Sequence, residues 1–240
     1  MITAASIGLI AAAGRQSAPP LTLPTVDLFA AYEARTGVTQ SPAGYASGWA
    51  DIGPNGYDLS QGDNNLKPLI TTVDGHAALN FSFNNPYLRQ LTRSGVTSLN
   101  TLTRTIYVVW RIASNANYYR ALRAATTAGT EWVGLFNPAG TRRYGIYDGG
   151  ERTPTIAVPG TLHRTTFIIP TTATLTVDIT GGTQASSFKQ PAAFGANTTI
   201  SIGAVGGVYY SLDAEIVAYY EYTAAHNTAV EDYIFQEWGV

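Results

Sequence analysis

The acidic residues that could catalyse a reaction are few and isolated along the chain. Retaining hydrolysis of a glycosidic bond needs two carboxyl groups about 5–5.5 Å apart. The closest approach to such a pair is Asp213-Ala214-Glu215, where the alternation of a strand would place both acids on one face. Val217 and Tyr219 follow on that face, which is typical of a strand acid that accepts a structural hydrogen bond. We therefore expect Glu215 to be structural and the chain to have no catalytic residues.

The histidines and the glycine-rich segment do not form a recognisable site. His76, His163 and His226 lie far apart, and none falls in an H-x-x-x-H or G-x-S-x-G context. We interpret them as solvated or structurally bonded side chains. The segment 203–207 follows no strand–helix pattern and contains no lysine, so it predicts a hairpin turn and not a phosphate-binding loop.

One short segment has the residue types of a cation site. Asp51, Asn55 and Asp58, with Gly56 between them, have a spacing similar to that of a calcium loop. Gly53 stands where such a loop has a ligand, which favours a plain turn rich in Asx residues. We expect no bound metal and no other cofactor. Cysteine is absent from the sequence, which excludes disulfides, zinc fingers, iron–sulfur clusters and thiol nucleophiles.

The composition of the 240 residues is that of a folded, β-rich chain with few charges. Charged residues make up 12%, against about a quarter in a typical domain. The 12 arginines and 2 lysines stand against 16 acidic residues, so the net charge of −2 excludes the basic footprint of a non-specific nucleic-acid binder. With 45% hydrophobic and 11% aromatic residues, the chain has enough apolar surface to fold.

Short β-prone segments recur from residue 26 onward and are separated by turns at Gly, Pro or Asn. The clearest is 104–112, in which Ile106, Val108, Trp110 and Ile112 share one face. The other predicted strands are 26–32, 77–83, 132–136, 144–147, 164–169, 175–179, 199–202 and 212–222. Many short strands with regular turns predict one all-β domain, an antiparallel two-sheet jelly-roll sandwich, over residues 26–240.

A single helix is predicted at the C-terminal end. Its apolar residues, Val230, Tyr233, Ile234 and Trp238, recur at helical spacing. Thr228 and Glu231 have the spacing of a capping box, and Gly239 predicts the end of the helix. The apolar stripe is therefore expected to pack on the sandwich.

The first 25 residues differ from the rest of the chain. Residues 2–13 are apolar and alanine-rich, but this segment is too short to span about 30 Å of hydrocarbon. The first charge, Arg15, follows the apolar segment instead of preceding it as in a secretory signal. The prolines of residues 14–25 favour an extended linker. We interpret residues 1–25 as an extended arm without membrane insertion, which packs on its own domain or docks on a partner subunit.

The order of motifs resembles that of concanavalin A-like lectin and laminin-G-type domains. The segment 49–59 (WADIGPNGYDL) is similar to the W-x-D-x-S-G-N-G-x-D-L stretch of that family. Pro68, the segment 75–81 (GHAALNF) and Leu88 are similar to its continuation, and 213–239 is similar to its closing strand and terminal W-G. The resemblance covers about residues 26–240 and implies a concanavalin A-like jelly roll.

Domains of this kind recur in bacterial surface proteins and in structural and adhesion proteins of tailed phages. The resemblance implies a non-enzymatic virion surface protein: a tail fibre, head spike or decoration subunit, assembled in the bacterial cytoplasm as a homo-oligomer. The arm 1–25 would contact other virion proteins, and the domain would bind host-surface polysaccharide. The alternatives are a structural capsid or tail cement protein and a divergent glycoside hydrolase. The chain lacks the E-x-D-x-E strand that such a hydrolase would have.

Aromatic residues near turns, several of them beside arginines, are the candidates for glycan binding. Sugars stack on aromatic rings, and a guanidinium pairs with the carboxylate of an anionic sugar. The candidate residues are Tyr118, Tyr119, Arg120, Arg142, Tyr144, Tyr147, Tyr209 and Tyr210. The alternative is that these tyrosines pack between the sheets or against a neighbouring subunit.

Overall fold

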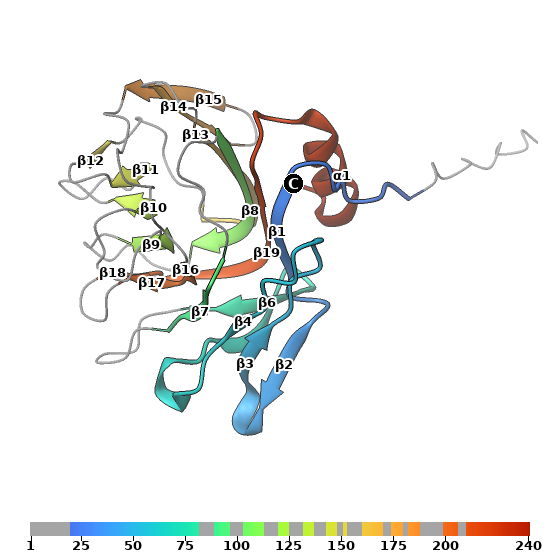
Figure 1. Cartoon of the computed structure of the whole chain (residues 1–240), viewed down its shortest axis with the longest axis vertical. Helices are drawn as coiled ribbons and strands as arrows, with labels where there is room; N and C mark the ends of the chain where they lie inside the picture. The colour runs from blue at the N-terminus through green and yellow to red at the C-terminus, as the bar shows by residue number, and fades with distance from the viewer. Residues whose placement is uncertain are drawn as a thin grey trace, which may run out of the picture.

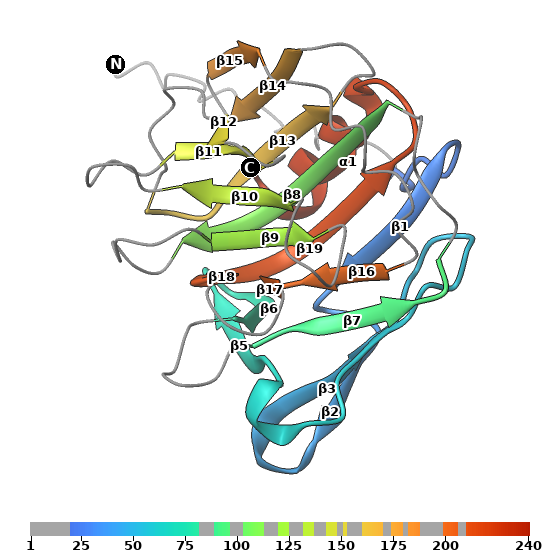
Figure 2. The ribbon, with the colours of Figure 1, turned by 60° about the vertical axis from the view of Figure 1, so that its left-hand side comes forward.

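Two antiparallel β-sheets face each other in the computed structural model, and one helix packs on the outside of one sheet (Figures 1 and 2). The structure describes residues 20–81, 89–96, 103–112, 120–124, 132–136, 143–147, 151–152, 160–169, 174–179, 182–187, 199–205 and 210–240. This arrangement confirms the predicted all-β, two-sheet sandwich with one C-terminal helix.

The sheet beneath the helix, called here the helix-side sheet, is built around two long strands. β8 (Arg104–Ile112) pairs with β19 (Ala214–Tyr222). β13 (His163–Ile169), β14 (Thr174–Ile179) and β15 (Gly182–Ser187) follow in order beyond β8. The other edge of β19 is shared by β1 (Leu28–Glu33) and by β6 (His76–Asn80), which in turn pairs with β5 (Leu69–Val73).

The second sheet, called here the opposite sheet, consists of shorter strands. Its order is β2 (Val38–Ser41), β3 (Tyr45–Trp49), β4 (Leu59–Ser60), β7 (Leu91–Ser94), β16 (Thr199–Ile202), β9 (Arg120–Ala124), β10 (Trp132–Phe136), β11 (Arg143–Tyr147) and β12 (Glu151–Arg152). A contact between β3 and β5 joins the two sheets at one edge. Two 3₁₀ turns, η1 (Pro42–Gly44) and η2 (Asn64–Leu66), lie near this junction.

A small hairpin forms a two-stranded sheet of its own beside β9 and β16. β17 (Ala204–Val205) pairs with β18 (Tyr210–Ser211) in antiparallel register. The hairpin lies where the glycine-rich segment predicts one. Its first strand follows Gly203, whose φ of +99° is accessible to glycine and strained for other residues.

The main core lies between the two sheets, and a second core lies under the helix. Ile106, Val108 and Trp110 of β8 belong to the main core, as predicted, while Tyr107 and Val109 belong to the second. Strand alternation sends successive residues to opposite faces, and here both faces are covered. Residues 104–110 of β8 and the whole of β19 are therefore buried.

The helix α1 (Thr228–Trp238) lies on the second core. The four residues of the predicted apolar stripe, Val230, Tyr233, Ile234 and Trp238, are all buried. Gly239 ends the helix in the left-handed conformation with φ +73°, and its N–H donates to the carbonyl of Phe235 at 2.9 Å. The prediction of the helix, its packing face and its end is confirmed.

The start of α1 corrects the predicted capping box. Asn227, and not Thr228, is the N-cap, because its side chain accepts the N–H of Ala229 at 3.0 Å. Glu231 turns instead toward β13 and pairs with Arg164 at 2.9 Å. The asparagine already caps the helix, so the carboxylate is free to neutralise a largely buried arginine on the sheet.

The segment that precedes β1 lies on α1. The N–H of Leu21 donates to Oε1 of Gln236 at 2.6 Å, and the hydroxyl of Tyr222 donates to the carbonyl of Pro24 at 2.6 Å. Leu23 packs against the second core. The last part of the predicted linker thus docks on its own domain, while residues 1–19 lie outside the described residues. In the described part of the chain, no helix has the length and apolar character needed to cross a membrane.

Candidate functional site

Asp51, the acid with calcium-loop spacing, holds the loop that follows β3. Its Oδ1 accepts the N–H groups of Ala31 and Gly53, both at 2.8 Å, and its Oδ2 accepts the N–H of Tyr57 at 2.8 Å. A carboxylate with three backbone donors is well satisfied within the protein. A Cβ at Gly53 would lie 2.9 Å from Oδ1 of Asp51, which explains the glycine at this position.

The other polar residues of this loop have similar roles. The side-chain amide of Asn55 donates to the carbonyl of Phe29 at 2.9 Å, and the carboxylate of Asp58 accepts the N–H of Asp51 at 2.9 Å. The loop is therefore clipped onto β1 by its own polar side chains. The motif behind the family resemblance stabilises the fold, which agrees with the interpretation as an Asx-rich turn.

Glu215 has the structural role that the sequence predicts. It lies opposite Arg111 in the β8–β19 register, and its Oε2 accepts Nε of Arg111 at 2.6 Å. The hydrogen bond to Glu215 raises the pKa of Arg111. The carboxylate of Glu215 is thus engaged in this ion pair, and Asp213 lies outside the strand.

A buried carboxylate, Glu33, anchors α1 to β1 and β19. Its Oε1 accepts the hydroxyls of Tyr220 and Tyr233, each at 2.7 Å, and its Oε2 accepts Nε of Arg35 at 2.8 Å. Burial and then the charge of Glu33 raise the pKa of Tyr220 well above its usual value, so its hydroxyl remains a donor. The guanidinium of Arg35 also lies 4.4 Å from the ring centroid of Trp238. This cluster holds the helix on the sheet.

A second buried carboxylate lies in the main core. Glu221 accepts Nη1 of Arg104 at 3.1 Å and the hydroxyl of Tyr219 at 2.7 Å. Both members of the ion pair are almost completely buried. A buried pair of this kind must stay complete, because loss of one partner leaves an uncompensated charge.

The three histidines are separated in space as well as in sequence. His76 packs edge-on against Trp238, and His226 contacts the carboxylate of Glu231 at 3.0 Å. Nδ1 of His163 lies 2.7 Å from the carbonyl of Thr161, so this nitrogen carries the hydrogen. Burial lowers the pKa of His163. No cluster of metal-binding side chains occurs among the residues that the structure describes.

Half of the predicted glycan-binding residues lie outside the described residues. These are Tyr118, Tyr119, Arg142 and Tyr209. The backbones of the others belong to strands of the opposite sheet and of the hairpin: Arg120 to β9, Tyr144 and Tyr147 to β11, and Tyr210 to β18.

The strand register brings two of these residues together and separates a third. Arg120 and Tyr144 both lie opposite Leu135 of β10, from the two neighbouring strands. Tyr147 lies opposite Trp132, three positions from Tyr144 along β11. The register thus places Arg120 and Tyr144 in one row across β10, on either side of Leu135.

A pair of polar residues that sequence reasoning missed lies at the junction of the two sheets. The guanidinium carbon of Arg89 lies 5.5 Å from the ring centroid of Tyr45, and Nη1 donates to the carbonyl of Asn80 over 3.4 Å. Both side chains are half-buried. The residues are 44 positions apart (89 − 45), and strand pairings between distant segments bring them close, so no local pattern could have revealed them.

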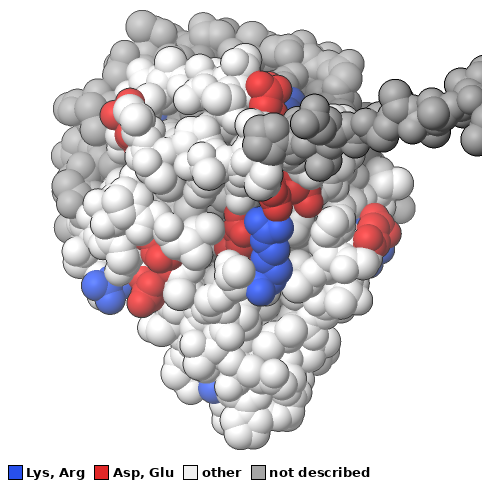
Figure 3. Space-filling view, turned by 90° about the vertical axis from the view of Figure 1, so that its right-hand side faces the viewer, with Lys and Arg blue, Asp and Glu red and all other residues white. Residues whose placement is uncertain are grey.

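Oppositely charged side chains lie close together on the face of the molecule that carries α1 (Figure 3). Figure 3 shows the side of the molecule that carries α1, where red and blue side chains lie next to one another and the lower part is almost uncharged. The ion pairs of Arg35, Arg111 and Arg164 supply such neighbours. Arg89 differs, because no carboxylate of the described residues is paired with it.

Solved structures share this fold at low sequence identity. The Trypanosoma rangeli sialidase in complex with sialic acid has a TM-score of 0.62 and 12% identity over 91% of this chain. The binding domain of botulinum neurotoxin serotype D has a TM-score of 0.60 and 10% identity over 88% of this chain. Domain 4 of AbnA, an extracellular GH43 arabinanase from Geobacillus stearothermophilus, in complex with arabinotriose, has a TM-score of 0.52 and 14% identity over 86% of this chain.

The fraction of each solved chain that this chain covers differs among the three structures. The chain spans 34% of the sialidase chain and 51% of the toxin chain, but 98% of the arabinanase domain. No protein-family model matches the sequence, and no curated protein matches it. At these identities the likeness establishes the β-sandwich fold of this chain and nothing further about it.

Proposed function

We propose that this chain is a non-enzymatic carbohydrate-binding domain. Its fold is similar to that of an arabinanase domain in complex with arabinotriose and of botulinum neurotoxin type C, whose cell entry depends on two ganglioside molecules. The observation that carries the proposal on this chain is the row Arg120–Leu135–Tyr144, where a guanidinium residue and an aromatic residue flank the same position of β10. Such a pair suits a sugar that presents an apolar face and a negative charge.

The absence of catalysis is part of the proposal. Hydrolysis of a glycosidic bond with two acids requires carboxyl groups that can exchange protons near the scissile bond. Glu33, Glu215 and Glu221 are instead held in ion pairs with arginines. We expect reducing-end release from bound polysaccharide to stay at the level of a blank, and release by the pure protein would contradict the proposal.

The proposed ligand is an extended acidic polysaccharide of a host surface. Arginine is the main basic residue of the chain, with 12 of the 14 basic positions, and it recognises carboxylates in a bidentate manner. In this proposal the domain belongs to a virion surface protein, and residues 1–25 contact other virion proteins. Assembly as a homo-oligomer would raise the affinity of weak single sites through multivalency.

The test measures retention of the purified chain on immobilised acidic and neutral polysaccharides. We expect Arg120→Gln and Tyr144→Ala to reduce retention about tenfold, as loss of a charged or stacking contact does. Arg143→Gln is the matched control, since this neighbour of Tyr144 lies in the other register row, opposite Phe136. Retention on acidic polymers should also fall as salt rises, because exposed charges are screened over about 10 Å at 0.1 M salt.

A purely structural role is the second candidate. Val26 and Phe235 are 78% and 66% exposed, on the segment before β1 and on α1, and exposed apolar side chains there favour a protein contact. A chain that is not retained on any polysaccharide, but that joins a virion assembly through this side, would support the cement role over the adhesin role.

A further inference from the structure

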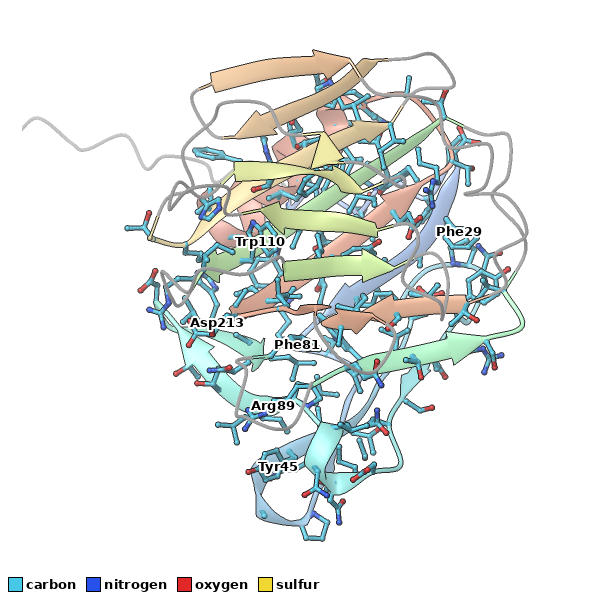
Figure 4. The ribbon with its side chains drawn as sticks, turned by 90° about the vertical axis from the view of Figure 1, so that its left-hand side faces the viewer. Phe29, Tyr45, Phe81, Arg89, Trp110 and Asp213 are labelled. Carbon is cyan, nitrogen blue, oxygen red and sulfur yellow. The ribbon has the colours of Figure 1, made fainter. Side chains whose placement is uncertain are left out.

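Arg89 is positioned by parts of the chain that are distant in sequence. In the β3–β5 register Tyr45 lies opposite Leu69, and in the β5–β6 register Leu69 lies opposite Asn80. This row places the Tyr45 ring and the Asn80 carbonyl on either side of one strand. The guanidinium of Arg89 contacts both, and in Figure 4 the labelled Arg89 lies between Phe81 and Tyr45.

The backbone at Arg89 is held in place by close packing. A Cβ added to Gly203 would overlap the ring of Phe81 and lie 2.6 Å from the carbonyl oxygen of Arg89. The backbone segments at Gly203 and Arg89 therefore approach as closely as glycine allows. The next residue, Gln90, donates its N–H to the carbonyl of Leu66 at 2.8 Å. The arginine therefore projects from a fixed backbone.

The backbone before Tyr45 is unusual. Ala43 has φ +73° and Gly44 has φ +79°, two consecutive residues in the left-handed region. For alanine this conformation is strained, and such strain is concentrated where a structure presents a particular residue. The turn η1 directly precedes Tyr45, and the ring of Tyr45 lies under the guanidinium of Arg89.

The remaining hydrogen-bonding capacity of Arg89 is large. A guanidinium has five N–H donors, and one of them makes the long bond to Asn80. A guanidinium that lies over an aromatic ring keeps its N–H groups in its own plane, directed away from the ring. Within the described residues no carboxylate is paired with Arg89, in contrast to Arg35, Arg104, Arg111 and Arg164.

We propose that Tyr45, Asn80 and Arg89 form a subsite for the carboxylate of an acidic sugar residue. The planar fork of Arg89 matches the two oxygens of a carboxylate, and the adjacent Tyr45 ring offers an apolar edge to the pyranose. Half-burial of both side chains makes the ion pair stronger than one in open water. The subsite rests on the proposed carbohydrate binding but is separate from the Arg120–Tyr144 row.

The ligand class follows from the neighbours of the arginine. A phosphate or sulfate needs no aromatic partner, whereas a sugar acid needs both an anion site and an apolar surface. Uronates and sialates share this chemistry, a pyranose that carries one carboxylate. The two sources can be separated with methyl β-glucuronide and the methyl glycoside of N-acetylneuraminate, with methyl β-glucoside as the neutral reference.

The experiment is a titration of the ¹⁵N-labelled full chain with each of the three glycosides, followed by NMR. We expect one or both acidic glycosides to bind weakly and to shift signals of Arg89, Tyr45 and their neighbours, while the neutral glycoside leaves them unchanged. Arg89→Gln should weaken this binding at least about tenfold, as loss of a charge-assisted pair does. Arg89→Lys keeps the charge but loses the fork, so its affinity should lie in between.

Arg93→Gln is the matched control, because Arg93 is an exposed arginine of β7 only four positions away. The unchanged amide spectrum of each variant shows that it is folded, and Arg89→Lys serves if Arg89→Gln is not. Binding that survives Arg89→Gln, or that is lost equally in Arg93→Gln, would overturn the subsite. So would wild-type chain that is retained on acidic polysaccharide but shows no shifts at Arg89, an outcome that leaves the proposed function intact.

Discussion

The region under α1 and the junction of the two sheets at Arg89 use the same residue types in opposite ways. Under the helix, Glu33 is bonded to two tyrosines and an arginine, and these partners lie on β19, on α1 and in the turn that follows β1. At the junction, Arg89 contacts one ring and one carbonyl and keeps most of its donors unused by the described residues. In the region under α1 the polar side chains around Glu33 are hydrogen-bonded to one another. At the junction most N–H groups of Arg89 make no hydrogen bond to the described residues.

The number of contacts that a polar side chain makes within the fold is a better guide to its role than the exposed fraction of that side chain. Arg35 is 38% exposed, yet its side chain is committed to Glu33, Glu237 and Trp238. Arg89 is half-buried, yet it makes only one long hydrogen bond and one ring contact with the described residues. Residues of the first kind should affect stability when they are changed, and residues of the second kind should affect binding.

The largest expected effect is that of Trp238→Ala in the region under α1. The ring is buried, packs against Arg35 and His76, and donates Nε1 to the hydroxyl of Tyr220 at 3.3 Å. We expect the free energy of unfolding, measured by urea denaturation, to fall by about 3–5 kcal/mol. Phe235→Ala on the exposed face of the same helix should change it by less than about 0.5 kcal/mol. Equal effects of the two changes would mean that the helix is not anchored by this face.

Gly203→Ala should have the next largest effect, at the junction. The new methyl group would overlap Phe81 and crowd the Arg89 carbonyl, and φ +99° is unfavourable for alanine. We expect a loss of about 2–4 kcal/mol in unfolding free energy from overpacking and backbone strain. Gly62→Ala is the control, because nothing lies within 4 Å of its Cβ position. A stable Gly203→Ala variant would show that the backbone at Arg89 is not fixed by this contact.

A smaller effect is expected for the segment before β1. A chain without residues 1–19 keeps Leu21, Leu23 and Pro24, while a chain without residues 1–25 loses their contacts with α1 and the second core. The second truncation should be about 1–2 kcal/mol less stable than the first, the value for partial burial of one leucine. Equal stability of the two chains would mean that residues 20–25 add nothing to the domain.

Much of the fold could be predicted from local sequence patterns. The strand 104–112 and the helix stripe have strong periodicity, and both are observed with the predicted faces buried. The missed strands of the two sheets are β2, β3, β4, β5, β7, β9, β12 and β15, and they are short or rich in Ser, Thr, Gly and Ala. These segments lack the regular apolar alternation that identifies a strand, and pairing with neighbouring strands places them in the sheet.

The candidate site was less predictable than the fold, for a physical reason. The calcium-like spacing of Asp51, Asn55 and Asp58 is local, and the structure explains it by bonds to nearby backbone. The contact between Tyr45 and Arg89 is non-local, since it depends on how β3 pairs with β4 and β5 and on how these strands pair with β7 and β6. A sequence pattern identifies contacts between residues that are close along the chain. It does not identify which residues of distant strands are paired.

The pH dependence of stability tests whether His163 is buried in its neutral form. Burial lowers its pKa below the usual value of about 6.5, so the folded chain binds this proton less readily than the unfolded chain. The stability that neutral His163 contributes is therefore complete above about pH 6.5 and is lost as the pH falls through the lowered pKa. Between pH 8 and pH 5, the wild type should lose stability relative to His163→Gln in urea denaturation. A constant difference between the two chains would contradict the buried, neutral state.

The smallest effect on stability is expected for Arg89→Gln, and it is the sharpest test of the comparison. Arg164 on β13 pairs with Glu231 at 2.9 Å, and both side chains are largely buried. Arg164→Gln leaves that carboxylate without its closest cation, so we expect a loss of about 1–3 kcal/mol. Arg89→Gln breaks one long hydrogen bond and a ring contact, so we expect less than about 0.5 kcal/mol. If both arginines cost the same in urea denaturation, Arg89 would be one more brace of the fold. If only Arg164 matters for folding, the fold does not require the guanidinium of Arg89, and that group is available for the carboxylate of the proposed subsite.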